Sequence, residues 1–504
     1  MNQFSRRKFI QTSALAAGAV AFSARSWAQV TGANSDIRVA VIGLNGRGKN
    51  HVSSLAAIKG VRIVALCDPD TAVLEKAKRL DGVDPSAKTY TDLRELFAAS
   101  DVDAVTIATP NHWHSLAGIW ACQAGKDVYV EKPISHNVWE GRQLAAAAKK
   151  YNRVVQAGMQ IRSGEGLREA VAYVRAGNLG KIIASRGLCY KRRDAIGKTT
   201  GAQPIPASIN YDLWTGPAPI LPPRRNSAKN GSVHYEWHWM WNYGNGDVGN
   251  QGIHQMDVAR WFLGEAGLPR HTFSIGGRVG YEDDGETPNT QIIVHDYASA
   301  PLIFEVRGLP SKPGKSAAIP AGLGSAEAAD AAAATMDKYH GVSIGNVVEC
   351  EGGMMIVPSY FNATAHDRDG KVIKEFKGKD SHMQNFIDVI RSRKTTDLFG
   401  PVDEGHVSSA LCHLGNISYQ VGRTMKPGEL AERTKGNNLT AEATGRMAEH
   451  LAAHGVDFAK TPLTLGAMLT VDAAKENFTG EFSAAANKFI TREYRAPFTV
   501  PQLA

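Results

Sequence analysis

Glu131-Lys132-Pro133 is the stretch of the sequence whose residue types suggest chemistry most directly. It follows residues 127–130, a short apolar run that predicts a buried strand, so the lysine lies at the carboxyl end of that strand. Ligands of open α/β sheets bind outside the carboxyl ends of the strands. A lysine there could hydrogen-bond a reacting oxygen. For these three residues alone, a solvated surface lysine is the alternative.

A second group of polar side chains follows a glycine-rich run in the other half of the chain. Asn250, His254 and Asp257 are four and three residues apart, which places them on one face of a helix predicted to begin near residue 250. Histidine titrates near neutral pH and could act as a general base or acid. We therefore predict a catalytic site at these three residues, the alternative being a structural histidine.

Residues 234–241 (HYEWHWMW) form an aromatic cluster just before that glycine-rich run. Such side chains pack in a core or stack on the rings of sugars. The sequence leaves both interpretations open.

A phosphate-binding turn is predicted at residues 43–48. It lies between a β-branched run at 37–42 and a helical pattern from about residue 51, the order in which backbone N–H groups at a helix start meet a pyrophosphate. Asn45 stands where the usual fingerprint has its second glycine, but asparagine tolerates a left-handed backbone. We expect the dinucleotide to contact Gly43, Asn45, Gly46, Arg47 and Gly48.

Asp68 follows a second apolar run, about twenty residues beyond the glycine turn, where an acidic side chain can bind both ribose hydroxyls. A carboxylate would repel a 2′-phosphate, so NAD is favoured over NADP. The alternative is that Asp68 begins the helix predicted at residues 71–80.

The elements that must position these residues define two kinds of sheet. Strands and helices alternate over residues 36–155, which predicts a doubly wound, Rossmann-type dinucleotide domain. Residues 156–430 contain strands in series, which predicts an α/β domain with an open, mostly antiparallel sheet. An inserted loop is predicted at 311–338, and residues 431–504 read as an extension that packs on the body and ends in an extended strand. The strands predicted for the second domain are 180–190, 272–281, 290–297, 302–306 and 345–351.

The glycine turn, Asp68, residues 109–114 (TPNHWH) and Glu131-Lys132-Pro133, in this order, resemble the glucose-fructose oxidoreductase / inositol dehydrogenase (Gfo/Idh/MocA) family. The resemblance implies an NAD(P)-binding domain followed by an α/β substrate domain. It also implies that Lys132 and His254 face the nicotinamide, with Asn250 where the family usually has aspartate. Further cofactor contacts implied in this way are Thr109, Asn111, His114, Glu131 and Lys132.

The first 28 residues read as a twin-arginine export signal, with Arg6-Arg7, an apolar stretch and Ala28 before the expected cleavage point. An amphipathic first helix is the alternative. Removal of the export signal deletes four basic residues and no acid, so the formal charge of the chain falls from +8 to +4. Without a basic stripe we expect no nucleic-acid partner, and without another long apolar run no stable membrane insertion. We expect a periplasmic protein that meets the twin-arginine export machinery.

The five cysteines are odd in number, widely spaced and mostly inside apolar runs. This pattern argues against a disulfide framework or a metal site and predicts buried thiols.

The leading hypothesis is an oxidoreductase that acts on a sugar or polyol hydroxyl with tightly bound, recycled NAD. The alternative is an NAD-dependent glycosidase that oxidises, eliminates, hydrates and reduces again. A third is a sugar-binding protein without catalysis. An open-faced sheet also suggests a homo-oligomer. His406 and His413 could reach the site or act structurally, and the sequence does not decide between these roles.

Overall fold

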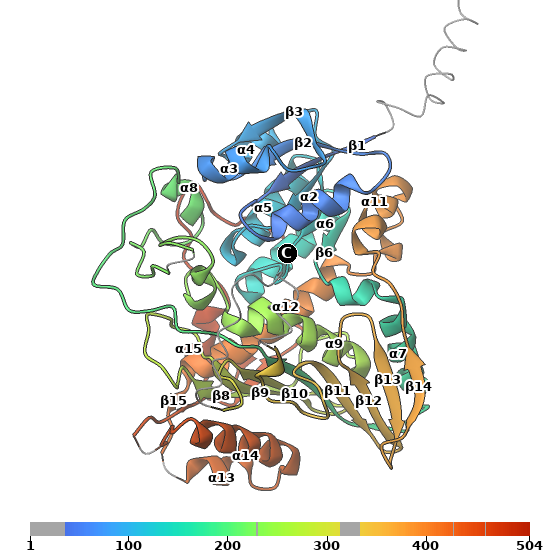
Figure 1. The fold of residues 1–504 in the computed structure, drawn as a ribbon, viewed down its shortest axis with the longest axis vertical. Coiled ribbons are helices and arrows are strands. Elements are labelled where there is room, and N and C mark those ends of the chain that lie inside the picture. Colours follow the sequence, from blue (N-terminus) through green and yellow to red (C-terminus); the bar gives the residue numbers. More distant parts are fainter. Residues whose placement is uncertain (1–35, 228–229, 313–332, 427, 459) are drawn as a thin grey trace, which may run out of the picture.

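The computed structural model describes residues 36–227, 230–312, 333–426, 428–458 and 460–504. Two sheet-based domains are stacked on each other, the first at the top of Figure 1 and the second at the bottom. The predicted export signal lies outside the described residues, as do residues 313–332 of the predicted insertion.

The N-terminal domain contains a six-stranded parallel sheet in the order β3-β2-β1-β4-β5-β6. Its strands are β1 (Ile37–Ile42), β2 (Val61–Cys67), β3 (Val83–Tyr90), β4 (Ala104–Ile107), β5 (Asp127–Val130) and β6 (Val155–Ala157). The strand order reverses between β1 and β4, the place where doubly wound sheets bind their ligands. The predicted Rossmann architecture is therefore confirmed.

Helices cover both faces of this sheet (Figure 1). They are α2 (Arg47–Ala56), α3 (Thr71–Ala77), α4 (Leu93–Phe97), α5 (Asn111–Gln123) and α6 (Val138–Lys150). One face is also packed by α11 (His382–Ser392) from the second half of the chain, whose Phe386 and Ile387 are buried in the same core cluster as residues of β1, with Phe386 against Tyr129 of β5. Helix α11, which begins more than 200 residues after the end of β6, thus completes the core of the first domain.

The second domain is built on a twelve-stranded mixed sheet in the part of the chain that the structure describes. Strand β7 is parallel to β10, and the other described neighbours are antiparallel, as predicted. The strands are β7 (Ile182–Tyr190), β8 (His271–Gly277), β9 (Thr290–Asp296), β10 (Leu302–Arg307), β11 (Ile344–Cys350), β12 (Gly353–Val357), β13 (Ala363–Asp367), β14 (Val372–Phe376), β15 (Arg423–Thr424), β16 (Thr464–Leu465), β17 (Leu469–Asp472) and β18 (Asn477–Thr479).

Helices pack on both faces of the second sheet (Figure 1). Helices α9 (Ile253–Leu263) and α12 (Val402–Val421) lie between the sheet and the first domain, and α14 (Asn438–Ala453) packs on the opposite face. The remaining helical segments are α7 (Glu165–Arg175), α8 (Tyr211–Thr215), α13 (Glu429–Thr434) and α15 (Ser483–Ala486), with 3₁₀ turns at Gln160–Ser163, Glu236–Trp239, Thr395–Asp397 and Asn487–Phe489 and a π-helical turn at Val248–Gly252.

The C-terminal segment differs from its prediction. Strands β16 and β17 pair with β8, so the chain beyond residue 430 supplies strands of the second sheet as well as packing on the body. The last residues, 496–504, carry no strand; Phe498 instead packs against Trp113 and Trp120 of α5. These strands are two to four residues long, too short to show an alternating pattern in the sequence.

All five cysteines are free and buried, as predicted. Among the described residues, no helix combines the length and apolarity needed to cross a bilayer. In the same part of the chain, no group of three or more His, Cys, Asp or Glu side chains is arranged to hold a metal ion.

Candidate active site

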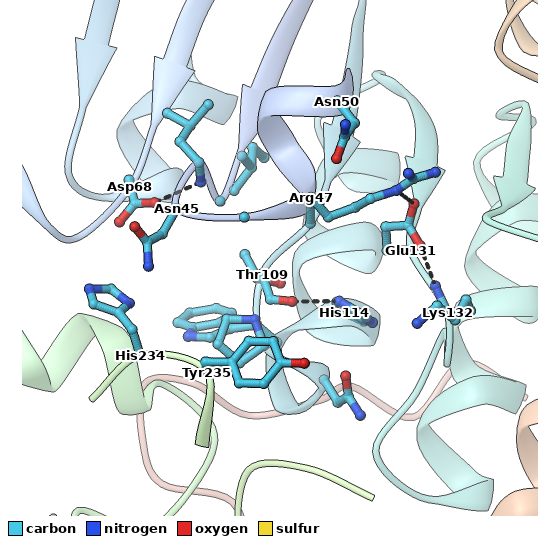
Figure 2. Close-up of a pocket in the computed structure, with 18 of the residues that line it drawn as sticks. Asn45, Arg47, Asn50, Asp68, Thr109, His114, Glu131, Lys132, His234 and Tyr235 are labelled. Atoms are coloured by element: carbon cyan, nitrogen blue, oxygen red, sulfur yellow. Dashed lines mark hydrogen bonds and ion pairs between the residues drawn. The ribbon is translucent and has the colours of Figure 1, made fainter. Parts of the chain in front are cut away.

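A cavity of about 710 Å³ lies at the carboxyl ends of the parallel strands and extends to loops of the second domain. Figure 2 shows Asp68 and Asn45 at one end, Glu131 and Lys132 at the other, and His234 and Tyr235 opposite the glycine turn. Twelve of the predicted site residues line it: Gly43, Asn45, Gly46, Arg47, Asp68, Thr109, Asn111, His114, Glu131, Lys132, Asn250 and His254. Gly48 and Asp257 are not among the lining residues.

The glycine turn has the shape of a phosphate cradle. A Cβ atom on Gly46 would meet no described atom within 4 Å, although this residue lines the cavity. The turn leads into α2, whose first turn has no acidic residue and no capping side chain. Free N–H groups at a helix start attract an anion. Open backbone and uncapped helix together fit the pyrophosphate of a dinucleotide.

Gly43 and Gly48 are required by packing. Gly43 has φ +82° and a Cβ there would lie 2.6 Å from the Ala108 carbonyl oxygen; a Cβ on Gly48 would lie 1.9 Å from the Gly43 oxygen. Gly48, which is not among the cavity-lining residues, allows α2 to pack closely on the turn, and its predicted contact with the cofactor stays a prediction.

Asp68 is buried at the end of β2 and accepts hydrogen bonds from the N–H groups of Leu44 (2.8 Å) and Asp70 (3.0 Å). Burial raises the pKa of its carboxyl group to about 6, although these N–H groups oppose the shift. A carboxylate can accept about four hydrogen bonds, so capacity for ribose hydroxyls remains. The side chain that caps α3 is Asp70, which accepts from Ala72 N–H, so the capping alternative applies to Asp70.

Glu131 is a buried carboxylate held by three side chains, two from α2 and one from the 3₁₀ turn at Gln160–Ser163. It accepts from Arg47 Nε at 2.9 Å and Gln160 Nε2 at 3.0 Å, and His51 Nε2 lies 3.0 Å away. Burial disfavours its charge, but His51 and Arg47 outweigh this and hold its pKa well below the usual range. Glu131 therefore remains ionised and fixes the turn that presents Lys132.

Lys132 extends from this turn to the second domain, where Nζ donates to the backbone oxygen of Asn250 at 2.5 Å. Asn250 belongs to the π-helical turn that precedes α9 rather than to the regular helix predicted to begin there. Such wide turns are frequent at functional sites. Burial lowers the pKa of Lys132 to about 8, and the charges of Arg47 and other basic neighbours act in the same direction.

His254 lines the cavity in the first turn of α9, and its ring lies 5.1 Å from that of Tyr360. Burial and the Lys132 charge lower its pKa to about 3, so the imidazole is neutral at neutral pH. Its Nδ1 atom has no hydrogen-bond partner in the described part of the chain. The expectation that His254 titrates near neutral pH is thus corrected, because desolvation disfavours the imidazolium.

Asp257 is not part of the reacting site, which corrects its predicted catalytic role. Its carboxylate forms an ion pair with Arg162 (Nε–Oδ2 2.8 Å) and accepts from Ser408 Oγ at 2.6 Å. The side chain is almost completely buried. Asp257 therefore ties α9 to neighbouring elements below the cavity.

The other histidines considered in the sequence analysis differ in whether they line the cavity. His114 lies in the cavity wall, with Nε2 2.8 Å from the Thr109 oxygen (Figure 2). The hydroxyl of Thr109 itself is buried without a described partner, which leaves it free to contact a cofactor. His406 contacts Glu476 and His413 contacts Ser135, and neither lines the cavity.

The aromatic cluster takes both roles that the sequence allowed. Trp239 and Met240 are buried in a core cluster with Tyr243, whereas other members line the cavity. The cavity-lining members are His234, Tyr235, Trp237 and His238.

Several wall residues were missed by sequence reasoning because no motif includes them. The second domain supplies Gln251, Tyr360, Phe361, Asp380 and His382, and the first domain's end supplies Gln160. None has a spacing that marks it, and only the tertiary fold brings them to the cavity.

A Rossmann sheet with an open phosphate cradle, joined to a mixed-sheet domain that closes the same cavity, defines a two-domain protein of the dinucleotide-binding class. Comparison with known families agrees with this class. Residues 37–159 match the model described as "Oxidoreductase family, NAD-binding Rossmann fold", and residues 177–277 match "Oxidoreductase family, C-terminal alpha/beta domain". These two matches, in chain order, show that both domains are similar to those of the Gfo/Idh/MocA oxidoreductases, and that the N-terminal domain is of the NAD-binding type.

Two curated relatives come from Shewanella sp. (strain ANA-3). Glycosyl hydrolase family 109 protein 1 is 31% identical over 153 residues, covering 29% of this chain and 33% of the relative. Glycosyl hydrolase family 109 protein 2 is 32% identical over 206 residues, covering 36% and 45%. The matches thus span less than half the length of these relatives.

Among solved structures, the WlbA dehydrogenase from Bordetella pertussis, in complex with NADH and UDP-GlcNAcA, has a TM-score of 0.53 to this chain. The two are 17% identical, and the match covers 75% of this chain and 95% of WlbA. This similarity extends the shared fold across both domains.

Proposed function

We propose that the protein oxidises a hydroxyl group of a sugar or polyol with NAD+, or reduces the corresponding carbonyl group with NADH. The observation that carries this proposal is Lys132, whose ammonium lies at the carboxyl end of β5 in the cavity that also contains the phosphate cradle. Its pKa of about 8 allows it to gain or lose a proton under ordinary conditions.

Bound NAD would accept and return a hydride. Lys132 hydrogen-bonds the reacting oxygen and, when neutral, receives its proton. His254, a neutral imidazole, offers a second acceptor, while the Asn250 side chain orients the hydroxyl. Glu131 does not contact the substrate; its three partners keep the lysine-bearing turn in place.

The cavity wall also suits a carbohydrate. Trp237, Tyr235 and Tyr360 supply aromatic surface, and Gln251 supplies an amide close to Lys132's partner Asn250. Sugar rings combine apolar C–H faces with hydroxyl groups, so mixed aromatic and polar walls match them.

A second candidate is an NAD-dependent glycosidase. The family 109 glycosyl hydrolases that match this chain favour it, as does Asn250 where the resembled family usually has aspartate. In this scheme the protein would oxidise a ring hydroxyl, eliminate the glycosidic substituent, add water and reduce the carbonyl again. A sugar-binding role without catalysis is less well supported, because Lys132 and His254 are both present in the cavity.

We further propose that the protein is exported by the twin-arginine pathway to the periplasm with NAD already bound, on the strength of residues 1–28. Contacts that cross the nucleotide end of the cavity favour a retained cofactor: Thr71 N–H donates to the Ser208 oxygen, and His234 Nε2 lies 2.9 Å from Asp70 Oδ2. Mass spectrometry of small molecules released from the denatured, extensively washed protein should find NAD in a molar amount similar to that of the chain.

One experiment separates the two catalytic candidates. Purified protein is incubated without added NAD, first with 4-nitrophenyl glycosides and then with an aldose followed by an acceptor sugar. Release of nitrophenol favours the glycosidase. Appearance of an NADH signal with the aldose, followed by its loss on addition of the acceptor, favours redox exchange. If no sugar gives either the nitrophenol or the NADH signal, both catalytic candidates are contradicted.

A further inference from the structure

Tyr360 lies in the loop that follows β12 and lines the cavity beside His254. No motif in the sequence marks it. The hydrogen bonds around its hydroxyl group, however, determine the direction in which the hydroxyl proton points.

The Tyr360 hydroxyl oxygen lies 2.9 Å from Gln251 Nε2, and Gln251 Oε1 lies 2.9 Å from Lys191 Nζ. An ammonium group has donors only, so the amide oxygen must face Lys191. The amide NH₂ group must then face Tyr360. Lys191 thereby makes the tyrosine oxygen the acceptor in its contact with Gln251.

The proton of the Tyr360 hydroxyl consequently needs another acceptor. No described residue accepts it, although the residue lies in the cavity wall. Burial raises the pKa of this phenol to about 12, so the proton is retained at neutral pH. A retained proton without an acceptor among the described residues is available to a ligand.

We propose that Tyr360 donates its hydroxyl proton in a hydrogen bond to an oxygen of the bound sugar, and that Gln251 and Lys191 are positioning residues that set the direction of this bond. This inference rests on the proposed function, because it takes a sugar as the occupant of the cavity. It assigns Tyr360 to substrate recognition rather than to the phosphate cradle.

Two substitutions test the relay. Tyr360→Phe removes the donor and keeps the ring. Gln251→Glu keeps the shape but replaces the amide NH₂ group with a carboxylate oxygen. The carboxylate pairs with Lys191 and accepts the hydroxyl proton of Tyr360. That proton then points away from the ligand. Tyr173→Phe is the matched control, because this tyrosine packs beneath β13 and β14, outside the cavity.

Binding is followed by tryptophan fluorescence, since Trp237 lines the cavity, for a panel of aldoses, polyols and aryl glycosides that includes D-glucose and myo-inositol. A neutral hydrogen bond contributes roughly 0.5–1.5 kcal/mol, so we expect sugar affinity about three- to tenfold weaker in Tyr360→Phe. Gln251→Glu should lose a similar factor, and the double variant should lose little more, because both changes remove the same bond. NAD content should not change.

The outcomes distinguish this inference from the function on which it rests. If the wild type binds a sugar and Tyr360→Phe binds it equally well, the inference is overturned and the proposed function stands. Additive losses in the double variant would also overturn the relay. If the wild type binds no member of the panel, the proposed function fails and this inference fails with it.

Discussion

Lys132 differs from an ordinary surface lysine in what surrounds its ammonium group. Nζ is held by a neutral backbone oxygen, that of Asn250, and the nearest carboxylate, Glu131, is already occupied by Arg47, His51 and Gln160. A buried ammonium without a carboxylate of its own loses its proton more easily than a solvated one. The same residue can therefore bind an oxygen and take its proton.

We expect hydroxyl oxidation to depend on the protonation of Lys132. Below pH 8 the side chain is a cation and cannot accept the substrate proton; above it the amine is neutral. Since burial lowers its pKa to about 8, kcat/KM for sugar oxidation should rise with pH and level off above that value. Steady-state rates over a pH series measure this, and a rate that falls through the same interval would contradict the assignment.

The structural role of Asp257 can be tested separately. Asp257→Asn leaves the buried Arg162 guanidinium with Glu404 as its remaining carboxylate partner. Breaking a buried ion pair costs about 3 kcal/mol or more, so urea unfolding should show a stability loss of this size. The folded variant should retain turnover. A variant with wild-type stability and no turnover would restore the catalytic role that the sequence suggested.

At the scale of elements, the sequence was informative wherever a strand is buried on both faces. Strands β1 and β5 appear as apolar runs with the bounds predicted for them, and β2 is the apolar run predicted before Asp68. Strand β3 was missed because it lies at the sheet edge and contains proline and charged residues. An edge strand needs no apolar pattern.

The turn before α9 shows a second limit. Periodicity placed Asn250, His254 and Asp257 on one helical face, but the π-helical turn shifts Asn250 out of that register. Its carbonyl, rather than its amide, then meets Lys132. Side-chain types predict such a backbone variation poorly.

The phosphate cradle makes an element-scale prediction. Gly46→Val places a side chain in the open space beside the start of α2, where the pyrophosphate is expected, so NAD content should fall at least tenfold by an order-of-magnitude steric argument. Gly445→Ala, also without close neighbours but in α14, is the control and should retain its NAD. Cofactor released from each denatured protein is quantified by mass spectrometry. Full NAD content in Gly46→Val would contradict the cradle.

At the scale of the whole molecule, the site depends on contacts that no local pattern contains. The first domain supplies the cradle and Lys132, whereas Asn250, His254 and Tyr360 come from the second domain. The family resemblance predicted this division and the histidine. It could not predict Tyr360 or Gln251, because the loop after β12 and the π-helical turn before α9 meet only in the tertiary fold.

The central claim, that Lys132 transfers the proton of a sugar hydroxyl while NAD takes the hydride, is tested most directly in the intact protein. Lys132→Ala is compared with wild type after both are shown to contain the same amount of NAD. Lys126→Ala is the control, a buried lysine of the same domain that donates to carbonyl oxygens outside the cavity.

The measurement is the NADH absorbance that appears when an aldose or polyol is added without external cofactor. We predict a signal in the wild type and in Lys126→Ala, and none above about a hundredth of it in Lys132→Ala, the size expected for loss of a general base. An undiminished signal in Lys132→Ala would contradict the account.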